Sequence, residues 1–168
     1  KQTVLPYLDS LSDVAKRIGA VNTVVNKNGK LYGYNTDAEG YLGALLNKGY
    51  DPKGKKIVFL GAGGVAEPLV KTLSDRDAGK IIIVNRTMEK AKALAENIER
   101  AEAHPFSEIE KCCDGADLLL NRNPIGMEGV DAEFEDLSFL KALKPDALVS
   151  DLIYAPRMTK LLKEAESL

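Results

Sequence analysis

The sequence predicts an α/β protein whose larger part is a doubly wound parallel sheet with helices on both faces. Beyond about residue 50, short unbroken apolar runs alternate with segments whose apolar residues have helical spacing. Runs that are apolar on both faces are typical of parallel strands covered on both sides by helices. A glycine-rich turn directly after the first of these runs is typical of the same architecture.

Length and composition restrict the functions that are open to the chain. It has 168 residues, which fits one domain, or one domain with a sizeable attachment. Its 23 Lys and Arg are balanced by 25 Asp and Glu, so there is no basic surplus to neutralise a nucleic-acid backbone. No apolar run approaches the ~20 residues that span a bilayer, and the first residues lack a signal-peptide pattern. We therefore expect a soluble protein with neither a nucleic-acid nor a membrane partner.

The two cysteines indicate a reducing compartment. Cys112 and Cys113 are sequence neighbours, and adjacent cysteines seldom have the geometry for a mutual disulfide. We expect a cytoplasmic location and interpret both thiols as packing residues, with a redox site as the alternative.

A helical segment and a hairpin are expected in the first part of the chain. Residues 4–18 have a mostly helical pattern, and Ser12 or Asp13 can cap its second part. Two β-rich runs within residues 21–34 are separated by Asn28-Gly29. Because both of these residues tolerate the positive φ of a type I′ turn, the pattern predicts a β-hairpin.

A helix and a linker follow the hairpin. Thr36 or Asp37 can cap the helix, and the segment 49–54, with Asp51-Pro52 between two glycines, is typical of a linker. The expected apolar face of this helix consists of Tyr41, Leu42, Leu45 and Leu46.

Beyond the linker, strands and helices are expected in strict alternation. The expected strands are residues 57–60, 81–84, a short run around 103, 118–120 and 147–149. The expected helices are residues 64–73, 87–98, one that begins at Ser107 with Glu110 completing a capping box, and one after Pro156. Pro68 is tolerated only if it lies in the first turn of its helix.

The glycine-rich turn predicts a phosphate-binding loop. Gly61-Ala62-Gly63-Gly64-Val65-Ala66 fits G-x-G-x-x-G/A, with Ala66 at the third place. Glycines there permit a tight turn and let a pyrophosphate reach backbone N–H groups at a helix N-terminus. The motif therefore predicts a Rossmann-like dinucleotide site, and the alternative is a turn that binds nothing.

The end of the second expected strand bears on the choice between NADP and NAD. A carboxylate at this position would accept hydrogen bonds from the 2′-hydroxyl of NAD and repel the 2′-phosphate of NADP. The sequence has Asn85-Arg86-Thr87 instead, with Lys90 one helical turn further on. These residues offer a phosphate hydrogen-bond donors and positive charge, so we expect NADP as the cofactor. The alternative is that Arg86 and Lys90 are solvated charges at the start of a helix.

Six motifs resemble, in order and spacing, shikimate dehydrogenase, and the resemblance runs the whole length of the chain. They are Gly19-Ala20-Val21-Asn22-Thr23, Gly33-Tyr34-Asn35-Thr36-Asp37, Gly61-Ala62-Gly63-Gly64, Asn85-Arg86-Thr87, Pro124-Ile125-Gly126-Met127 and Asp151-Leu152-Ile153-Tyr154. The resemblance implies NADPH-dependent reduction of 3-dehydroshikimate to shikimate, a step of aromatic amino-acid biosynthesis. It also implies a partial substrate domain at residues 1–46 and an NADP-binding domain at residues 47–168.

The resemblance also implies roles for individual residues. Lys1 and Asp37 are expected to face the reacting oxygen, and Asn22 and Asp37 to hold hydroxyl groups of the substrate. The residues with other implied roles are Asn35 and Thr36, which shape the turn, and Met127 and Tyr154, which line the nicotinamide pocket.

The chemistry of this lysine and aspartate is sound on general grounds. Hydride transfer to a carbonyl carbon leaves an alkoxide, which needs a proton or a positive charge nearby. A lysine supplies both, and a neighbouring carboxylate keeps it charged, but the sequence leaves open which of the two is the formal acid–base. Apart from the resemblance, Lys1 is only a terminal lysine and Asp37 only a helix cap. His104, which precedes Pro105, is interpreted as a surface or core residue with no catalytic role.

The sequence departs from the family pattern in two respects. A serine pair that grips the substrate carboxylate and a C-terminal helix with a substrate-binding glutamine are missing, so we expect a fragment or a chain that a partner completes. Asn121-Arg122-Asn123 stands where the family usually has Asn-Ala-Thr. The added cation either contacts a phosphate or crowds the nicotinamide ribose, and the sequence does not decide between these.

Two other functions stay open. An NAD-dependent quinate/shikimate dehydrogenase would be favoured by a carboxylate at the end of the second strand. A non-catalytic dinucleotide-binding module is favoured by the missing substrate-domain parts and opposed by the presence of Lys1 and Asp37. In the leading interpretation the partner is a small-molecule substrate, with a homodimer as one open option for the assembly.

Overall fold

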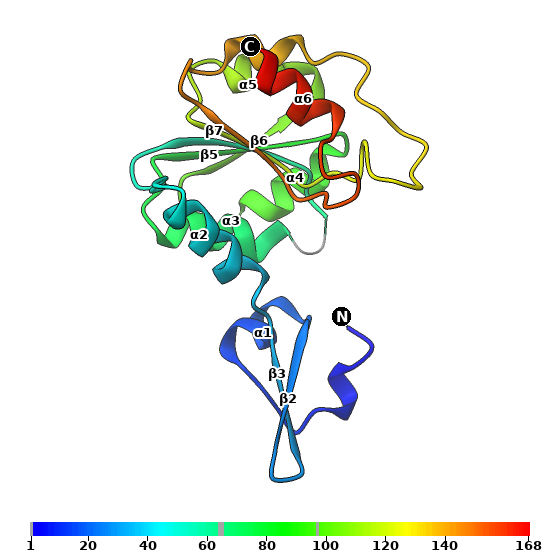
Figure 1. Cartoon of the computed structure of the whole chain (residues 1–168). Helices are drawn as coiled ribbons and strands as arrows, with labels where there is room; N and C mark the ends of the chain where they lie inside the picture. Colours follow the sequence, from blue (N-terminus) through cyan, green and yellow to red (C-terminus); the bar gives the residue numbers. More distant parts are fainter. Residues whose placement is uncertain (1, 64–65, 97) are drawn as a thin grey trace.

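The computed structural model describes residues 2–63, 66–96 and 98–168 (Figure 1). Their strands form two sheets, one of three strands near the N-terminus and one of five strands in the larger part. In Figure 1 the small sheet stands away from the larger part, and a single helix follows the connection between them.

The first segment is less helical than the sequence predicts. A 3₁₀ turn, η1 (Leu5–Tyr7), is followed by a short strand, β1 (Ser10–Leu11), and only then by α1 (Asp13–Ile18). The expectation of a mostly helical segment at residues 4–18 is therefore wrong, because β1 pairs in parallel with a strand that lies later in the sequence. The prediction for Ser12 is confirmed, since its side chain accepts a hydrogen bond from the Ala15 backbone N–H at 3.2 Å.

The predicted hairpin is confirmed. Strands β2 (Thr23–Lys27) and β3 (Lys30–Tyr34) are antiparallel, and the small sheet has the order β1-β3-β2. Asn28 and Gly29 connect the two strands with φ values of 53° and 82°. Two positive φ values in succession are what a type I′ turn requires, so the local sequence alone determines this connection.

Helix α2 (Asp37–Asn47) starts where the sequence predicts but packs with the larger part. The Thr36 side chain makes no capping hydrogen bond; instead Asn35 Oδ1 accepts one from the Asp37 backbone N–H at 3.2 Å. Ala38 and Leu45 are buried in the same hydrophobic cluster as the first strand of the large sheet. The division at residues 1–46 and 47–168 stays a prediction, and this packing favours a boundary at the start of α2.

The five strands of the large sheet are all parallel, which confirms the predicted doubly wound fold. They are β4 (Lys56–Leu60), β5 (Lys80–Asn85), β6 (Ala101–Pro105), β7 (Leu118–Asn121) and β8 (Leu148–Asp151). Their order is β6-β5-β4-β7-β8, so the chain leaves β4 toward one edge and later crosses back to add β7 on the other side. This order is that of a Rossmann-like sheet with its switch point between β4 and β7.

Helices cover both faces of this sheet (Figure 1). Helices α2, α3 (Ala66–Asp75) and α4 (Met88–Ala95) pack on one face, against alternate strand residues such as Ile57 and Phe59. Helices α5 (Ile109–Cys113) and α6 (Lys160–Ser167) and the 3₁₀ turn η3 (Ser138–Ala142) pack on the other, against residues such as Val58 and Leu60.

Cys112 and Cys113 are free and buried in this second cluster, where they act as packing residues. No helix of the described residues is long and apolar enough to span a membrane.

Helix α3 ends at Asp75, two residues beyond the prediction, and the helices that follow β5 and β6 also have other boundaries than expected. Helix α4 ends at Ala95 rather than Ile98, because the Ile98 N–H donates to the Ala95 carbonyl at 3.0 Å in a tighter turn. The capping box at Ser107 does not form. Residues Phe106–Glu108 form a 3₁₀ turn, η2, and the carboxylate of Glu108 contacts His104 Nδ1 at 2.8 Å. Pro68 lies in the first turn of α3, as expected.

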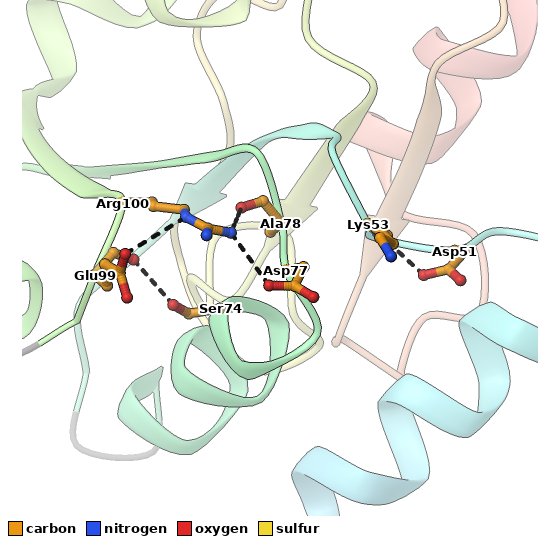
Figure 2. Close-up of polar contacts among 7 residues, drawn as sticks. All are labelled: Asp51, Lys53, Ser74, Asp77, Ala78, Glu99 and Arg100. Atoms are coloured by element: carbon orange, nitrogen blue, oxygen red, sulfur yellow. Dashed lines mark hydrogen bonds and ion pairs between the residues drawn. The ribbon is translucent and has the colours of Figure 1, made fainter.

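Polar contacts join the loops at the edge of the sheet where the strands begin (Figure 2). Arg100 Nη1 donates to the Ala78 carbonyl at 3.4 Å and lies 3.5 Å from an Asp77 carboxylate oxygen. Ser74 Oγ donates to the Glu99 carbonyl at 2.9 Å. These contacts tie the turn after α3 to the turn before β6, so they fix the end of the sheet that lies opposite the candidate site.

Asp117, directly before β7, joins three lysines at this same edge. Its carboxylate accepts hydrogen bonds from the Lys56 backbone N–H at 2.8 Å and from Lys144 Nζ at 2.6 Å, and Lys55 Nζ lies at 3.6 Å. Burial raises the pKa of Asp117, but the hydrogen bonds from Lys144 and Lys56 outweigh burial and leave the pKa below its ordinary value. The charged carboxylate is therefore the form that stabilises the fold.

We predict that Asp117→Asn lowers the free energy of unfolding at pH 7 by about 1–3 kcal/mol, because charge-assisted hydrogen bonds are lost. A carboxyl group with a lowered pKa stabilises the fold above its unfolded pKa, and this contribution disappears as the pH falls through the folded pKa. Urea denaturation at pH 7 and pH 3 should therefore show a deficit that shrinks below pH ~4. Asp75→Asn, which removes an exposed pair with Lys71, is the control and should cost less than ~1 kcal/mol. A deficit of equal size at both pH values contradicts the assignment.

Candidate functional site

The candidate site lies at the edge of the large sheet where the strands end. In a doubly wound sheet, ligands bind beyond the carboxyl ends of the strands at the switch point. Two hollows lie here, a groove of about 180 Å³ and a cavity of about 540 Å³. Residues Arg122, Asn123 and Pro124, which follow β7, line both, so the two hollows adjoin along this loop.

The groove brings together most of the residues predicted to bind a cofactor. Its lining comes from the loops that follow β4, β5 and β7. The predicted cofactor residues that line it are Gly61, Ala62, Gly63, Asn85, Arg86, Thr87 and Lys90. Gly64 and Val65, which the sequence also predicts, lie outside the described residues.

Gly61 occupies a position that excludes a side chain. Its φ is +105°, and an added Cβ would lie 2.7 Å from Asn123 Oδ1 and 3.3 Å from the Asn123 backbone nitrogen. Its own N–H donates to the Val84 carbonyl at 2.9 Å. The first glycine of the motif is therefore required both by its backbone conformation and by the close approach of the loop after β7.

Asn85 connects the glycine turn to the end of β5. Its Oδ1 accepts a hydrogen bond from the Ala62 backbone N–H at 3.2 Å, and its Nδ2 donates to the Thr87 carbonyl at 2.9 Å. The amide thus holds the two loops in register, and both of its ends contact the backbone. This positioning contact is one that the sequence pattern does not reveal.

The groove is cationic. Among the described residues that line it, Arg86, Lys90 and Arg122 are positively charged and none is acidic. The end of β5 thus presents a guanidinium, a hydroxyl and an ammonium group, as the sequence predicts. Such a surface favours a phosphate ligand on electrostatic grounds.

The larger cavity lies between Asp37, at the start of α2, and the loops after β7 and β8. Met127 and Tyr154, predicted to contact the nicotinamide, both line it, and their exposed fractions are 37% and 90%. The lining residues are Asp37, Leu69, Arg122, Asn123, Pro124, Met127, Leu152, Ile153 and Tyr154. A partly apolar cavity with a carboxylate at its rim adjoins the cationic groove.

Asn22 and Asp37, predicted to hold substrate, are in direct contact. Asn22 Nδ2 donates to Asp37 Oδ1 at 2.6 Å, and Asn22 Oδ1 accepts from the Thr36 backbone N–H at 3.1 Å. Below them the buried Asn35 donates from Nδ2 to the Ala20 carbonyl at 3.2 Å. The two loops on either side of the hairpin are thereby fixed to each other. Lys1, the third residue predicted at this site, lies outside the described residues.

Asp151, at the end of β8, holds in place the loop whose residues 152–154 line the larger cavity. Its carboxylate accepts hydrogen bonds from Asn121 Nδ2 at 3.1 Å, Thr159 Oγ1 at 2.8 Å and the Ile153 backbone N–H at 3.0 Å. Burial raises the pKa of Asp151, and these three hydrogen bonds oppose that effect. The motif 151–154 begins with Asp151, but the sequence pattern indicates no role for this residue.

His104 belongs to neither hollow. Its ring nitrogens lie 2.8 Å from a Glu108 carboxylate oxygen and 3.5 Å from a Glu102 oxygen, on the edge strand β6. This arrangement agrees with the expectation that it has no catalytic role.

The fold and the glycine turn at its switch point are those of Rossmann-like α/β proteins. Residues 45–122 match the family model described as Shikimate / quinate 5-dehydrogenase. Over 99% of its length the chain is 42% identical to shikimate dehydrogenase (NADP(+)) of Alkaliphilus metalliredigens, of which it covers 60%. The chain is therefore similar to shikimate dehydrogenases along nearly its whole length, in agreement with the resemblance seen in its motifs.

Solved structures agree with this relationship. A shikimate dehydrogenase in complex with NADP⁺ superposes with a TM-score of 0.82 at 36% identity, covering 99% of this chain and 59% of that one. The quinate dehydrogenase of Corynebacterium glutamicum in complex with NAD gives 0.83 at 32% identity, covering 100% and 61%. The chain thus spans about 60% of the length of the relatives that it matches.

We predict that Gly61→Ala destabilises the protein by about 1–3 kcal/mol, because a strained backbone combines with a clash against Asn123. Gly129→Ala is the matched control: its φ is +80°, but an added Cβ meets nothing within 4 Å. It should cost only about 1 kcal/mol, from backbone strain alone. Urea denaturation of both variants measures the difference, and equal losses would show that the Asn123 contact does not matter.

Proposed function

We propose that the chain is the NADP-binding part, with a portion of the substrate domain, of an enzyme that reduces 3-dehydroshikimate to shikimate with NADPH. The observation that carries this proposal is the cationic groove over the glycine turn, with Arg86 and Lys90 at the end of β5 and no acid among its described lining residues. In support, curated relatives at about 40% identity are named shikimate dehydrogenase (NADP(+)).

The described residues fit a dinucleotide. The glycine turn and the end of β5 line one groove, so a pyrophosphate beside Gly63 would lie close to the start of α3, and the groove continues from there to Arg86, Thr87 and Lys90. In this proposal these three residues bind the 2′-phosphate. The nicotinamide then occupies the larger cavity, which Met127 and Tyr154 line.

NADPH, when bound, supplies the hydride that reduces the substrate ketone. Asp37 lies on the wall of the same cavity, and the Asn22 side chain donates a hydrogen bond to its carboxylate at 2.6 Å. We propose that Asn22 and Asp37 orient substrate hydroxyls and that Lys1, with Asp37, delivers the proton to the oxygen that hydride transfer leaves negative. Which of Lys1 and Asp37 is the formal acid–base stays open.

An NAD-dependent quinate/shikimate dehydrogenase is the alternative within the same class of enzyme. The similar structure of the quinate dehydrogenase with bound NAD keeps it open. The absence of a carboxylate at Asn85-Arg86-Thr87 argues against it, because NAD selection at this position uses an acid. A non-catalytic dinucleotide-binding module is the second alternative, and a turnover assay distinguishes it.

The chain covers only part of the length of its relatives, which concerns whether it works alone or within a longer protein. A span of about 60% of their length, together with a small sheet that has three strands among the described residues, fits a chain that functions as part of a longer protein. The proposed partner is a small molecule, shikimate or 3-dehydroshikimate. A cytoplasmic location and a homodimer stay predictions.

We predict that the chain binds NADPH more tightly than NADH. Arg86→Ala should raise the Kd of NADPH by about 10-fold to 100-fold, since a charge-assisted hydrogen bond is lost, and should leave the Kd of NADH nearly unchanged. Isothermal titration of both cofactors measures this. Lys92→Ala, which removes a charge from the outer part of α4, is the control and should change neither Kd. Equal affinities of the unmodified chain for the two cofactors would contradict the proposed NADP site.

We predict that Lys1→Ala and Asp37→Asn, made in the full-length protein, each lower kcat for 3-dehydroshikimate by about 100-fold or more. The double variant should be far from additive, because both residues act on the same oxygen, and the Kd of NADPH should barely change. The isolated 168-residue chain should bind NADPH yet turn over slowly, since substrate positioning is incomplete. Near-normal kcat in either single variant would remove that residue from the mechanism.

A further inference from the structure

Arg122 is held at a fixed place between the two hollows. Its backbone N–H donates to the Leu60 carbonyl at 2.9 Å, at the end of β4. The next residue is held as well, because Asn121 Oδ1 accepts a hydrogen bond from the Asn123 N–H at 3.0 Å. Asn121 in turn donates to Asp151 at 3.1 Å. The Cα position of Arg122 is therefore set by β4, β7 and β8 together.

The guanidinium of Arg122 lies over the glycine turn. A Cβ added to Gly63 would meet Arg122 Nη1 at 3.4 Å, Cζ at 3.7 Å and Nη2 at 4.0 Å. The head group is thus beside the backbone that the proposed site offers to a pyrophosphate. Arg122 is partly buried, and within residues 2–63, 66–96 and 98–168 its side chain makes no hydrogen bond or ion pair.

We propose that Arg122 binds the diphosphate of the dinucleotide and so recognises the part that NADPH and NADH share. This inference rests on the proposed function and deepens it. A guanidinium presents a planar fork of donors that matches two phosphate oxygens, and in a partly buried groove such a pair is strong. The groove then divides its cations between two tasks. Arg122 at the glycine turn holds the diphosphate, while Arg86 and Lys90 at the end of β5 select the 2′-phosphate.

The geometry favours this role over the two other roles open to the residue. A cation that crowded the nicotinamide ribose would project into the larger cavity, whereas the three guanidinium atoms named above approach Gly63. A cation for a substrate carboxylate would also have to face that cavity. Arg122 contributes to the lining of both hollows, but its guanidinium is the part that lies beside Gly63. The experiment therefore separates the diphosphate from both the ribose and the substrate.

The test uses four cofactor probes, NADPH, NADH, ADP-ribose and adenosine 2′-monophosphate, and shikimate as a substrate probe. Arg122→Gln should raise the Kd of NADPH, NADH and ADP-ribose by a similar factor, on the order of 10-fold or more. The Kd of adenosine 2′-monophosphate, which lacks the diphosphate, should stay within about twofold. Arg122→Lys, which keeps the charge without the fork, should lie between Arg122→Gln and the unmodified chain. Lys92→Ala should change none of the four.

The opposite results are equally defined. An unchanged Kd for ADP-ribose in Arg122→Gln overturns the assignment. A lower Kd for NADPH in the same variant also overturns it, and shows instead that Arg122 crowds the nicotinamide ribose. A raised Kd for shikimate with an unchanged Kd for ADP-ribose overturns it in favour of the substrate carboxylate. If the unmodified chain binds neither NADPH nor NADH, the proposed function itself is wrong. If it binds them and Arg122→Gln binds them equally well, only the assignment of Arg122 is wrong.

Discussion

The close approach of two loops at Gly61 is the constraint on which the site depends. The turn after β4 passes within contact distance of Asn123, which lies in the loop after β7. This contact leaves no room for a Cβ at Gly61. Asn85 fixes the next residue of the turn, and Asn121 fixes Asn123. The cationic groove exists because these backbone segments are held side by side, so its shape follows from hydrogen bonds and one missing side chain rather than from a packed apolar wall.

Local patterns account for what the sequence predicts correctly about the fold. The Asn28-Gly29 turn and the unbroken apolar strands each depend on residues near in sequence, and the parallel pairing of the large sheet follows from the alternation of these strands with helices. The errors arise where distant residues decide. Residues Ser10 and Leu11 form a strand only because β3 is available to pair with them, and the expected cap at Ser107 gives way to a turn whose Glu108 contacts His104.

The candidate site shows the same division between local and distant determinants. The glycine turn and the cationic loop at Arg86 are contiguous motifs, so the sequence reveals them and the fold then brings them into one groove. The joining roles of Asn85 and Asp151 depend on partners in other loops, and neither could be read from spacing. The orientation of Arg122 is of this second kind, because the sequence leaves its side chain two directions and only the position of Gly63 distinguishes them.

The packing of α2 has a consequence for motion between the two parts of the chain. Because Ala38 and Leu45 are buried with β4 and α3, this helix belongs mechanically to the large sheet, and Asp37 at its first turn travels with it (Figure 1). A hinge between the parts must therefore act before Asp37. Rotation of the small sheet about such a hinge leaves the distance between Asp37 and Arg122 unchanged. It instead strains the 2.6 Å hydrogen bond from Asn22 to Asp37, which connects the two parts.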